Sequence, residues 1–251
     1  MLHRRTLEKA AKPGLRFQGW KALPLGSKIA VIVLLAIVLM GLLAPLIATY
    51  NPSTTGLAEG TTYQEGIGEI TTVTVEPNGE QLFGTDKTGR DVFSRVVYGS
   101  RVSIVVGLSA TALALAVAVV LGAIAATARK WVSEVLMRVL DIVMSFPGIA
   151  LAAVLVSALS QSLPMLPVII VSIAILYIPQ LTRVVRANIL SQFGEDYVAA
   201  SKVMGASVPW ILAKHVARNC IAPIMVFATV LVADAIVFEA SLSFIGAGIK
   251  S

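Results

Sequence analysis

Two carboxylates, Asp234 and Glu239, lie within the last apolar stretch of the chain, which runs from about Cys220 to Ile245. A carboxylate at the centre of a bilayer costs about 2.5–3.5 kcal/mol on insertion scales, so acids in such a stretch tend to face a cavity or a partner. Two roles are open for this pair. Both acids line a path through the membrane, or Glu239 lies at the outer interface while Asp234 pairs with a polar group in the helix bundle.

Other side chains with reactive chemistry are scarce. The sequence has two histidines, His3 and His215, and one cysteine, Cys220, which leaves no partner for an intrachain disulfide. No serine–histidine pair or metal-ligand cluster can be assembled within the membrane from these residues, which argues against an intramembrane serine or zinc protease. The phosphate-binding pattern G-x-x-x-x-G-K-[ST] is absent, so we expect no ATP hydrolysis by this chain. The sequence therefore predicts a non-catalytic protein with no metal and no cofactor of its own.

The composition indicates a membrane protein made of helices. Of 251 residues, 57% are hydrophobic and only 14% are charged, whereas soluble domains carry about 25% charged residues. The net charge of +6 does not indicate nucleic-acid binding, because the lysines and arginines lie mostly beside the apolar segments.

Long runs without charge predict five membrane-spanning helices, since each needs about 20 residues. The run from Ile142 to Thr182 has no charge for 41 residues, so we expect a break near Ser160–Pro167. Pro147 and Pro179 are expected to kink the flanking spans. The predicted spans cover residues 29–50, 102–128, 142–160, 167–188 and 220–245.

Charge distribution predicts the orientation of these spans. Residues 1–28 are basic, which places the N-terminus in the cytoplasm. Residues 51–100 hold seven acids and three bases, and we expect them to form an extracytoplasmic cap, β-rich or irregular. In this cap the alternating run 71–75 predicts a strand, and Asn78–Gly79 predicts a hairpin turn. Within the second span, small residues are expected to let helices pack closely. They are Gly107, Ala112, Ala116 and Gly122.

A polar stretch from Glu195 to Pro223 interrupts the apolar second half and predicts a helix, a tight turn and a second helix. Gly205 would end the first helix, Ser207 would cap the second, and Pro209 would fit its first turn. One face of the first helix is small and apolar: Ala199, Ala200, Val203 and Met204. A plain surface hairpin and a DNA-binding helix-turn-helix are alternatives. The membrane-length segments on both sides argue against DNA.

This stretch resembles the cytoplasmic "EAA" loop of ABC-importer permeases. The matching residues are Asp196, Ala199, Ala200, Gly205, Ala206 and Pro223. In that family the loop docks in a cleft of a separate ATPase subunit, and the resemblance implies the same role for the coupling loop 191–219. The residues expected to couple are Asp196, Tyr197, Ala199, Ala200, Lys202, Met204, Gly205, Ala206, Ser207 and Pro209.

A second pattern, just before the second span, resembles the dipeptide/oligopeptide/nickel permeases, and within them the second of two permease subunits. Its residues are Gly84, Thr85, Asp86, Gly89, Arg90, Asp91 and Arg95. Residues 239–248 resemble the same branch. From the residues themselves we expect only that Arg90 pairs with a neighbouring acid and that Thr85 or Asp86 caps a helix.

The resemblance implies a type I ABC importer transmembrane domain, with residues 101–251 as its core, in a bacterial cytoplasmic membrane. That family continues through one more span, so either a sixth span follows Ser251 or this protein differs by having five. The implied partners are a second permease subunit, two ATPase subunits that bind ATP and Mg²⁺, and an extracytoplasmic substrate-binding protein. Di- or oligopeptides, nickel and another small solute remain alternative substrates. A secondary transporter that works without ATP is the alternative of another class.

Overall fold

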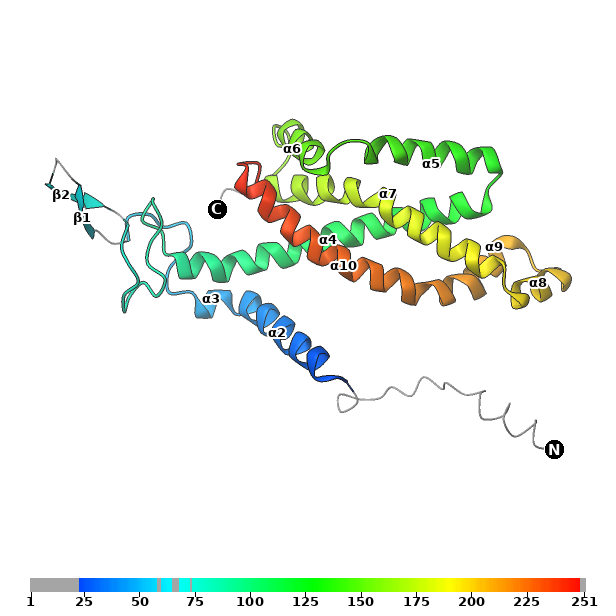
Figure 1. Ribbon diagram of the computed structural model, residues 1–251, viewed down its shortest axis with the longest axis horizontal. Helices are drawn as coiled ribbons and strands as arrows, with labels where there is room; N and C mark the ends of the chain where they lie inside the picture. The colour runs from blue at the N-terminus through cyan, green and yellow to red at the C-terminus, as the bar shows by residue number, and fades with distance from the viewer. Residues whose placement is uncertain (1–22, 58–59, 65–67, 73, 249–251) are drawn as a thin grey trace.

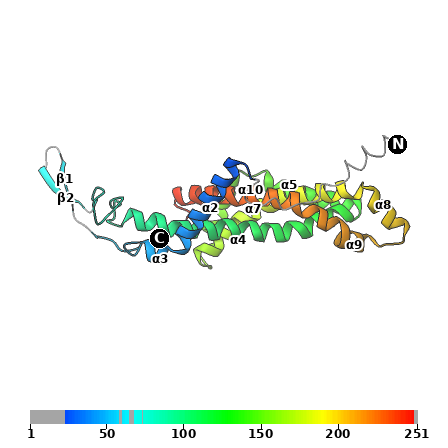
Figure 2. The same cartoon turned by 90° about the horizontal axis from the view of Figure 1, so that it is seen from below.

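The computed structural model describes residues 23–57, 60–64, 68–72 and 74–248. Most of the predicted basic segment 1–28, including His3, lies outside the described residues. Figures 1 and 2 show an elongated helical bundle with a pair of strands at one end and two short helices at the other. The helices are α2 (Leu25–Leu42), α3 (Ala44–Ile47), α4 (Val92–Thr127), α5 (Lys130–Met144), α6 (Gly148–Leu159), α7 (Met165–Phe193), α8 (Asp196–Val203), α9 (Val208–Ile211), the π-helix η2 (Leu212–Val216) and α10 (Ala217–Phe244).

The first span, α2, lies on the outside of the bundle. Gly41 is its only buried residue, and a Cβ atom there would lie 3.1 Å from the Ser100 Oγ of α4. Pro45 sits in the first turn of the short helix α3, which directly follows α2. The exposed apolar surface of α2 is what a helix surrounded by lipid or by another subunit requires.

The predicted cap contains strands, one of which overlaps the expected strand 71–75 at Thr71 and Thr72, while residue 73 lies outside the described residues. The strands β1 (Gly60–Gln64) and β2 (Gly68–Thr72) pair antiparallel, so the prediction of a β-containing cap is confirmed. The hairpin turn at Asn78–Gly79 was wrong. Asn78 Oδ1 instead accepts hydrogen bonds from the backbone N–H groups of Glu80 and Gln81, both at 2.8 Å. A local Asx turn therefore uses the asparagine without joining two strands.

The helix α4 is 36 residues long, about 54 Å at the normal rise per residue. It begins ten residues before the predicted span and is longer than a bilayer crossing requires. Its buried stripe follows helical spacing: Val97, Val106, Gly107, Ala110, Ala114, Ala118, Gly122 and Ala125. Gly107 and Gly122 thus pack as predicted. Ala112 and Ala116 are exposed, so they do not pack against the other helices of this chain.

The third crossing is not a single straight helix. The helices α5 and α6 meet at Ser145–Pro147 with a bend of 87°. Proline removes a backbone donor and restricts the residue before it, which explains a break at this point. The predicted span 142–160 was therefore wrong in shape, since α6 alone has 12 residues, about 18 Å.

The core is built by α4, α7 and α10, with α6 packed on α7 (Figure 1). Glycine makes the closest approach possible, because a Cβ on Gly122 would lie 2.6 Å from the Val185 Cγ1 of α7. Pro179 and Pro223 both lie inside helices, α7 and α10. Among the described residues, four helices are long and apolar enough to cross a membrane, and five if the bent pair α5–α6 counts as one crossing.

Candidate functional site

An elbow of α8, a glycine turn and α9 closes the end of the bundle opposite the strands (Figure 1). Asp196 lies in the first turn of α8 and Lys202 in the last, which suits the helix dipole at both ends. Gly205 has a φ of +84°, and a Cβ there would meet nothing within 4 Å. The glycine is therefore required by backbone conformation and not by lack of space.

The turn is a Schellman motif. The Ala206 N–H donates to the Ser201 carbonyl at 3.1 Å, and the Gly205 N–H donates to the Lys202 carbonyl at 3.0 Å. Ser207 occupies the cap position of α9, but its side chain makes no capping hydrogen bond, so that part of the prediction was wrong. Pro209 sits in the first turn of α9, as predicted.

One side of the elbow is fixed to the bundle. Val198 of α8 and Ile211 of α9 are fully buried, in one apolar cluster with Val185 and Ile189 of α7 and Val216 of η2. The second arm of the elbow, α9, continues without a break through η2 into α10. π-Helical turns of this kind occur often at functional positions.

Polar and aromatic contacts add to this attachment. The Tyr197 hydroxyl donates to Gln192 Oε1 at 2.8 Å and accepts from Asn219 Nδ2 at 3.3 Å. The His215 ring lies beside two aromatic rings, with centroids 5.0 Å from Trp210 and 6.3 Å from Tyr197. Residues of α7, α8, η2 and α10 are thus joined at one junction.

The other side of the elbow is open and apolar. Val203 is 89% exposed and Met204 79% exposed. Ala199, Ala200, Gly205, Ser207 and Pro209 are exposed too, whereas Tyr197 and Ala206 are half-buried. We call the exposed side the elbow face, defined by Ala199, Ala200, Val203, Met204 and Gly205. The predicted coupling residues therefore divide into an attached set and a free set.

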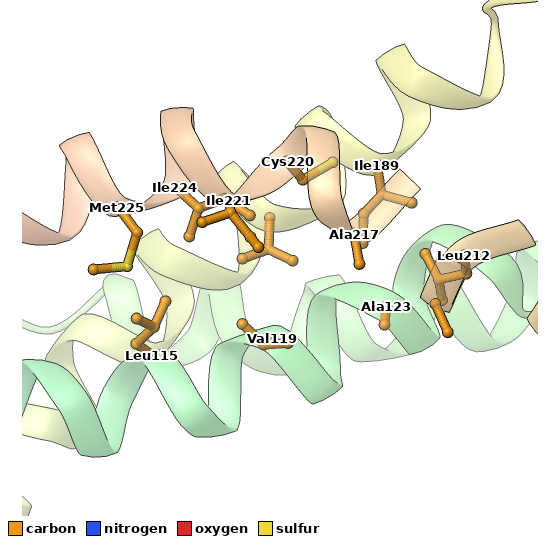
Figure 3. Close-up of a pocket in the computed structure, with 12 residues that line it drawn as sticks. Leu115, Val119, Ala123, Ile189, Leu212, Ala217, Cys220, Ile221, Ile224 and Met225 are labelled. Carbon is orange, nitrogen blue, oxygen red and sulfur yellow. The ribbon is translucent and has the colours of Figure 1, made fainter. Parts of the chain in front are cut away.

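An apolar groove of about 360 Å³ lies next to the elbow, between α4 and α10 (Figure 3). Leu115, Val119 and Ala123 of α4 face residues of α10, among them Ile221 and Met225. The helices are therefore not in full contact at the level where η2 joins α10.

Both acids of the last span accept hydrogen bonds, Asp234 from a residue of α7 and Glu239 from a residue of its own helix. The Tyr177 hydroxyl of α7 donates to Asp234 Oδ2 at 2.7 Å, while the remainder of Asp234 is exposed on the bundle surface. Glu239 is 7% exposed, and its Oε1 accepts from the Ser243 hydroxyl at 3.0 Å. The pairing of Asp234 with a polar group of the bundle is confirmed. The tyrosine, 57 residues earlier in the chain, gave no sequence signal.

The signature residues from Gly84 to Asp91 form a compact loop before α4, and Arg95 lies in the first turn of that helix. Gly84 and Gly89 have φ values of +71° and +75°, and a Cβ on Gly84 would lie 2.4 Å from the Val75 carbonyl oxygen. Thr85 Oγ1 accepts from the Val75 N–H at 2.7 Å. The helix cap is Asp91, whose carboxylate accepts from the Ser94 N–H at 2.8 Å, so neither Thr85 nor Asp86 has the predicted capping role.

Asp86 is instead the centre of a charge cluster. Its carboxylate pairs with Arg90 at 2.9 Å and also with Arg95. Burial alone would raise the pKa of the Asp86 carboxyl, but hydrogen bonds from Thr88 and Arg90 outweigh it and hold that pKa well below its usual range. The expected ion pair of Arg90 with a neighbouring acid is therefore confirmed.

The predicted sites lie at separate places along the bundle. The elbow lies at one end, and the signature loop and Glu239 lie at the other. Across the described residues, no group of three or more histidines, cysteines and acids could hold a metal ion.

Comparison with known proteins identifies the family. Residues 118–250 match the family described as the binding-protein-dependent transport system inner membrane component. The chain belongs to this family. It is an inner-membrane transport component, in agreement with its apolar helices and with the resemblance seen in the sequence.

Individual relatives of this transport component cover most of its length. A protein of Brucella suis biovar 1 with a provisional name, peptide transport system permease protein, is 38% identical over 222 residues, 88% of this chain and 69% of its own. The dipeptide transport system permease protein DppC of Haemophilus influenzae is 33% identical over 228 residues, which are 90% of this chain and 73% of that protein. DppC of Alkalihalophilus pseudofirmus is 38% identical over 175 residues, which are 70% of this chain and 57% of that protein.

Proposed function

We propose that this chain is a permease subunit of an ATP-driven importer of short peptides, and that the elbow face docks on a separate ATPase subunit. The observation that carries the proposal is the contrast between the two sides of the elbow. Val198 and Ile211 are fully buried against the bundle, while Val203 and Met204 remain 89% and 79% exposed.

The exposed side has the character of a binding surface. Val203 and Met204 follow one another at the tip of α8, where the chain has left the apolar spans. Burying such a side chain fully stabilises an assembly by about 1.5–3 kcal/mol. The alanines beside them let a second protein approach the helix closely. A docking partner would therefore gain most from the residues that this chain leaves uncovered.

The attached side would transmit movement. Because Val198 and Ile211 pack with α7 and the second arm runs into α10, a displacement of the elbow would displace both spans. The groove of Figure 3 leaves room between α4 and α10 for such a shift. We propose that ATP-driven closure of the ATPase subunits moves the elbow and opens the path outward, and that hydrolysis resets the inward-facing state.

Asp234 supports a path beside α10. An exposed carboxylate on a membrane span is unfavourable against lipid, and its bond to Tyr177 occupies only one oxygen. We propose that this side of α10 faces the second permease subunit and the water-filled path between the two subunits.

The names of the relatives favour peptides over nickel or another small solute. The partners of the assembly would be a second permease subunit, two ATPase subunits that bind ATP and Mg²⁺, and an extracytoplasmic binding protein. The basic N-terminal segment supports a cytoplasmic N-terminus and a cytoplasmic elbow.

The test is uptake of a labelled dipeptide by the complete importer in proteoliposomes that contain ATP. Ala200→Glu and Gly205→Asp should abolish uptake while membrane insertion is retained. Gly79→Asp, at an exposed glycine of the polar loop before α4 where a Cβ would meet nothing within 4 Å, is the matched control and should transport normally. Unchanged ATP-coupled uptake in the elbow variants would refute the docking role. Uptake driven by an ion gradient through this chain alone would favour the ATP-independent alternative.

A further inference from the structure

The helices α4 and α10 touch closely at one level and separate toward the outer end (Figure 1). A Cβ on Gly107 would lie 3.0 Å from the Val232 carbonyl oxygen and 3.0 Å from Ile236 Cγ1, so the helices cannot approach further there. At Gly99, about two turns earlier on α4, a Cβ would meet nothing within 4 Å. The separation forms a cleft of about 820 Å³ lined by both Gly99 and Glu239.

The walls of this outer cleft combine apolar side chains with polar ones and carry both signs of charge. Arg95, Tyr98 and Arg101 line it from α4, and Glu239 and Ser243 line it from α10. Its volume lies in the range of about 300–1,000 Å³ typical of small-molecule sites. This differs from the groove of Figure 3, which is lined by apolar residues.

Of the charged residues that line the cleft, Arg95 already forms an ion pair, with Asp86. Glu239 and Arg101 do not pair with each other. Glu239 is more than nine-tenths buried, and within the described part of the chain its carboxylate has a hydroxyl donor, Ser243, but no cation within ion-pair distance. Arg101 likewise has no ion-pair partner among the described residues. A buried carboxylate without a cation is costly, so a bound cation would stabilise it.

We propose that the outer cleft binds the two charged ends of a short peptide. The α-ammonium group of the peptide donates to the Glu239 carboxylate, and the α-carboxylate accepts a bidentate pair from the Arg101 guanidinium. Gly99 leaves the space in which the peptide backbone lies. The inference rests on the proposed function and adds to it a site with its ligand chemistry, a zwitterion with both ends free.

The test uses the complete importer with Gly99→Cys and Cys220→Ala, so that a maleimide reports on the floor of the cleft. A dipeptide with free ends should slow the labelling, and its N-acetylated, C-amidated form should not. Adding Glu239→Gln or Arg101→Gln should raise the half-protecting concentration about 10- to 100-fold, as expected for the loss of one charge-assisted hydrogen bond. Glu134→Gln and Arg138→Gln, both exposed on α5, are the controls and should leave protection unchanged.

A labelling rate that the free dipeptide does not change, or equal protection by the N-acetylated, C-amidated dipeptide, would overturn the proposal. Labelling blocked without any peptide would overturn it as well, because another chain would then fill the cleft. Dipeptide uptake is measured on the same preparations. If dipeptide uptake persists while the peptide fails to slow labelling of Gly99→Cys, the peptide site in the cleft is rejected and the proposed function stands. If the unmodified importer takes up no dipeptide, the proposed function is rejected. As a second measurement, Glu239→Gln should raise the KM for uptake by a similar factor with little change in kcat.

Discussion

Replacing Val203 by aspartate should separate docking from folding. The Val203 side chain is 89% exposed, so the chain itself gains little from its contacts. Exposed substitutions usually change the free energy of unfolding by less than about 0.5 kcal/mol. In the docked complex the same side chain would be buried, which is worth about 1.5 kcal/mol or more for a valine. Since 1.4 kcal/mol is a factor of ten, the Kd for the ATPase subunit should rise at least about tenfold.

The assay is the affinity of the purified permease for its ATPase subunit in nanodiscs, measured with thermal unfolding of the permease alone. Leu82→Asp is the control, because Leu82 is an apolar residue of 53% exposure at the opposite end of the molecule. Val203→Asp should weaken binding and leave the unfolding temperature unchanged, and Leu82→Asp should leave both binding and the unfolding temperature unchanged. Wild-type affinity in a folded Val203→Asp permease would refute the argument from exposure.

Three further predictions follow from single residues. Gly205→Ala should lower transport and cost about 1–2 kcal/mol of stability, because φ is +84° there. Gly79→Ala is the control and should change neither transport nor stability, since Gly79 has open space around it and no positive φ. Calorimetry measures the stability of both variants, and peptide uptake measures their transport. Tyr177→Phe should lower the unfolding temperature, because it removes a hydrogen bond to a charged group that is worth about 1.5–3 kcal/mol. Asp234→Asn can still accept this bond and should lower the unfolding temperature less. An equal decrease in the two variants would show that the bond is not the cause. The lowered pKa of Asp86 means that its cluster stabilises the fold above the ordinary aspartate pKa of about 3.9 and loses this contribution as the pH falls further. Thermal unfolding of the wild type between pH 5 and pH 2 should therefore show a loss that Asp86→Asn reduces.

The sequence predicted the features that depend on local pattern. Charge-free runs located four of the five predicted spans, the bent pair α5–α6 being the exception. Gly205 with its neighbours located the elbow, because a positive φ strongly favours glycine. The pairing of Arg90 with a nearby acid could also be predicted from local pattern, since Arg90 and Asp86 lie four residues apart.

Features that depend on tertiary packing could not be predicted. Pro147 was expected to kink a span and does lie at the bend between α5 and α6, but the size of the bend, 87°, depends on packing that the sequence does not show. The bond between Tyr177 and Asp234 joins residues distant in sequence. Asn78–Gly79 has the sequence pattern of a hairpin turn, but the Asn78 side chain forms a local Asx turn instead. The outer cleft exists because α4 and α10 touch at Gly107, which no periodicity reveals.

The most direct test of the account is the accessibility of the elbow face. A cysteine at Met204, with Cys220→Ala, is treated with a membrane-impermeant maleimide in intact cells and in inverted membrane vesicles. The account predicts labelling only in inverted vesicles stripped of the ATPase subunits, and protection when these subunits are added back. Labelling of Met204→Cys from outside intact cells, or labelling unaffected by the ATPase subunits, would contradict it.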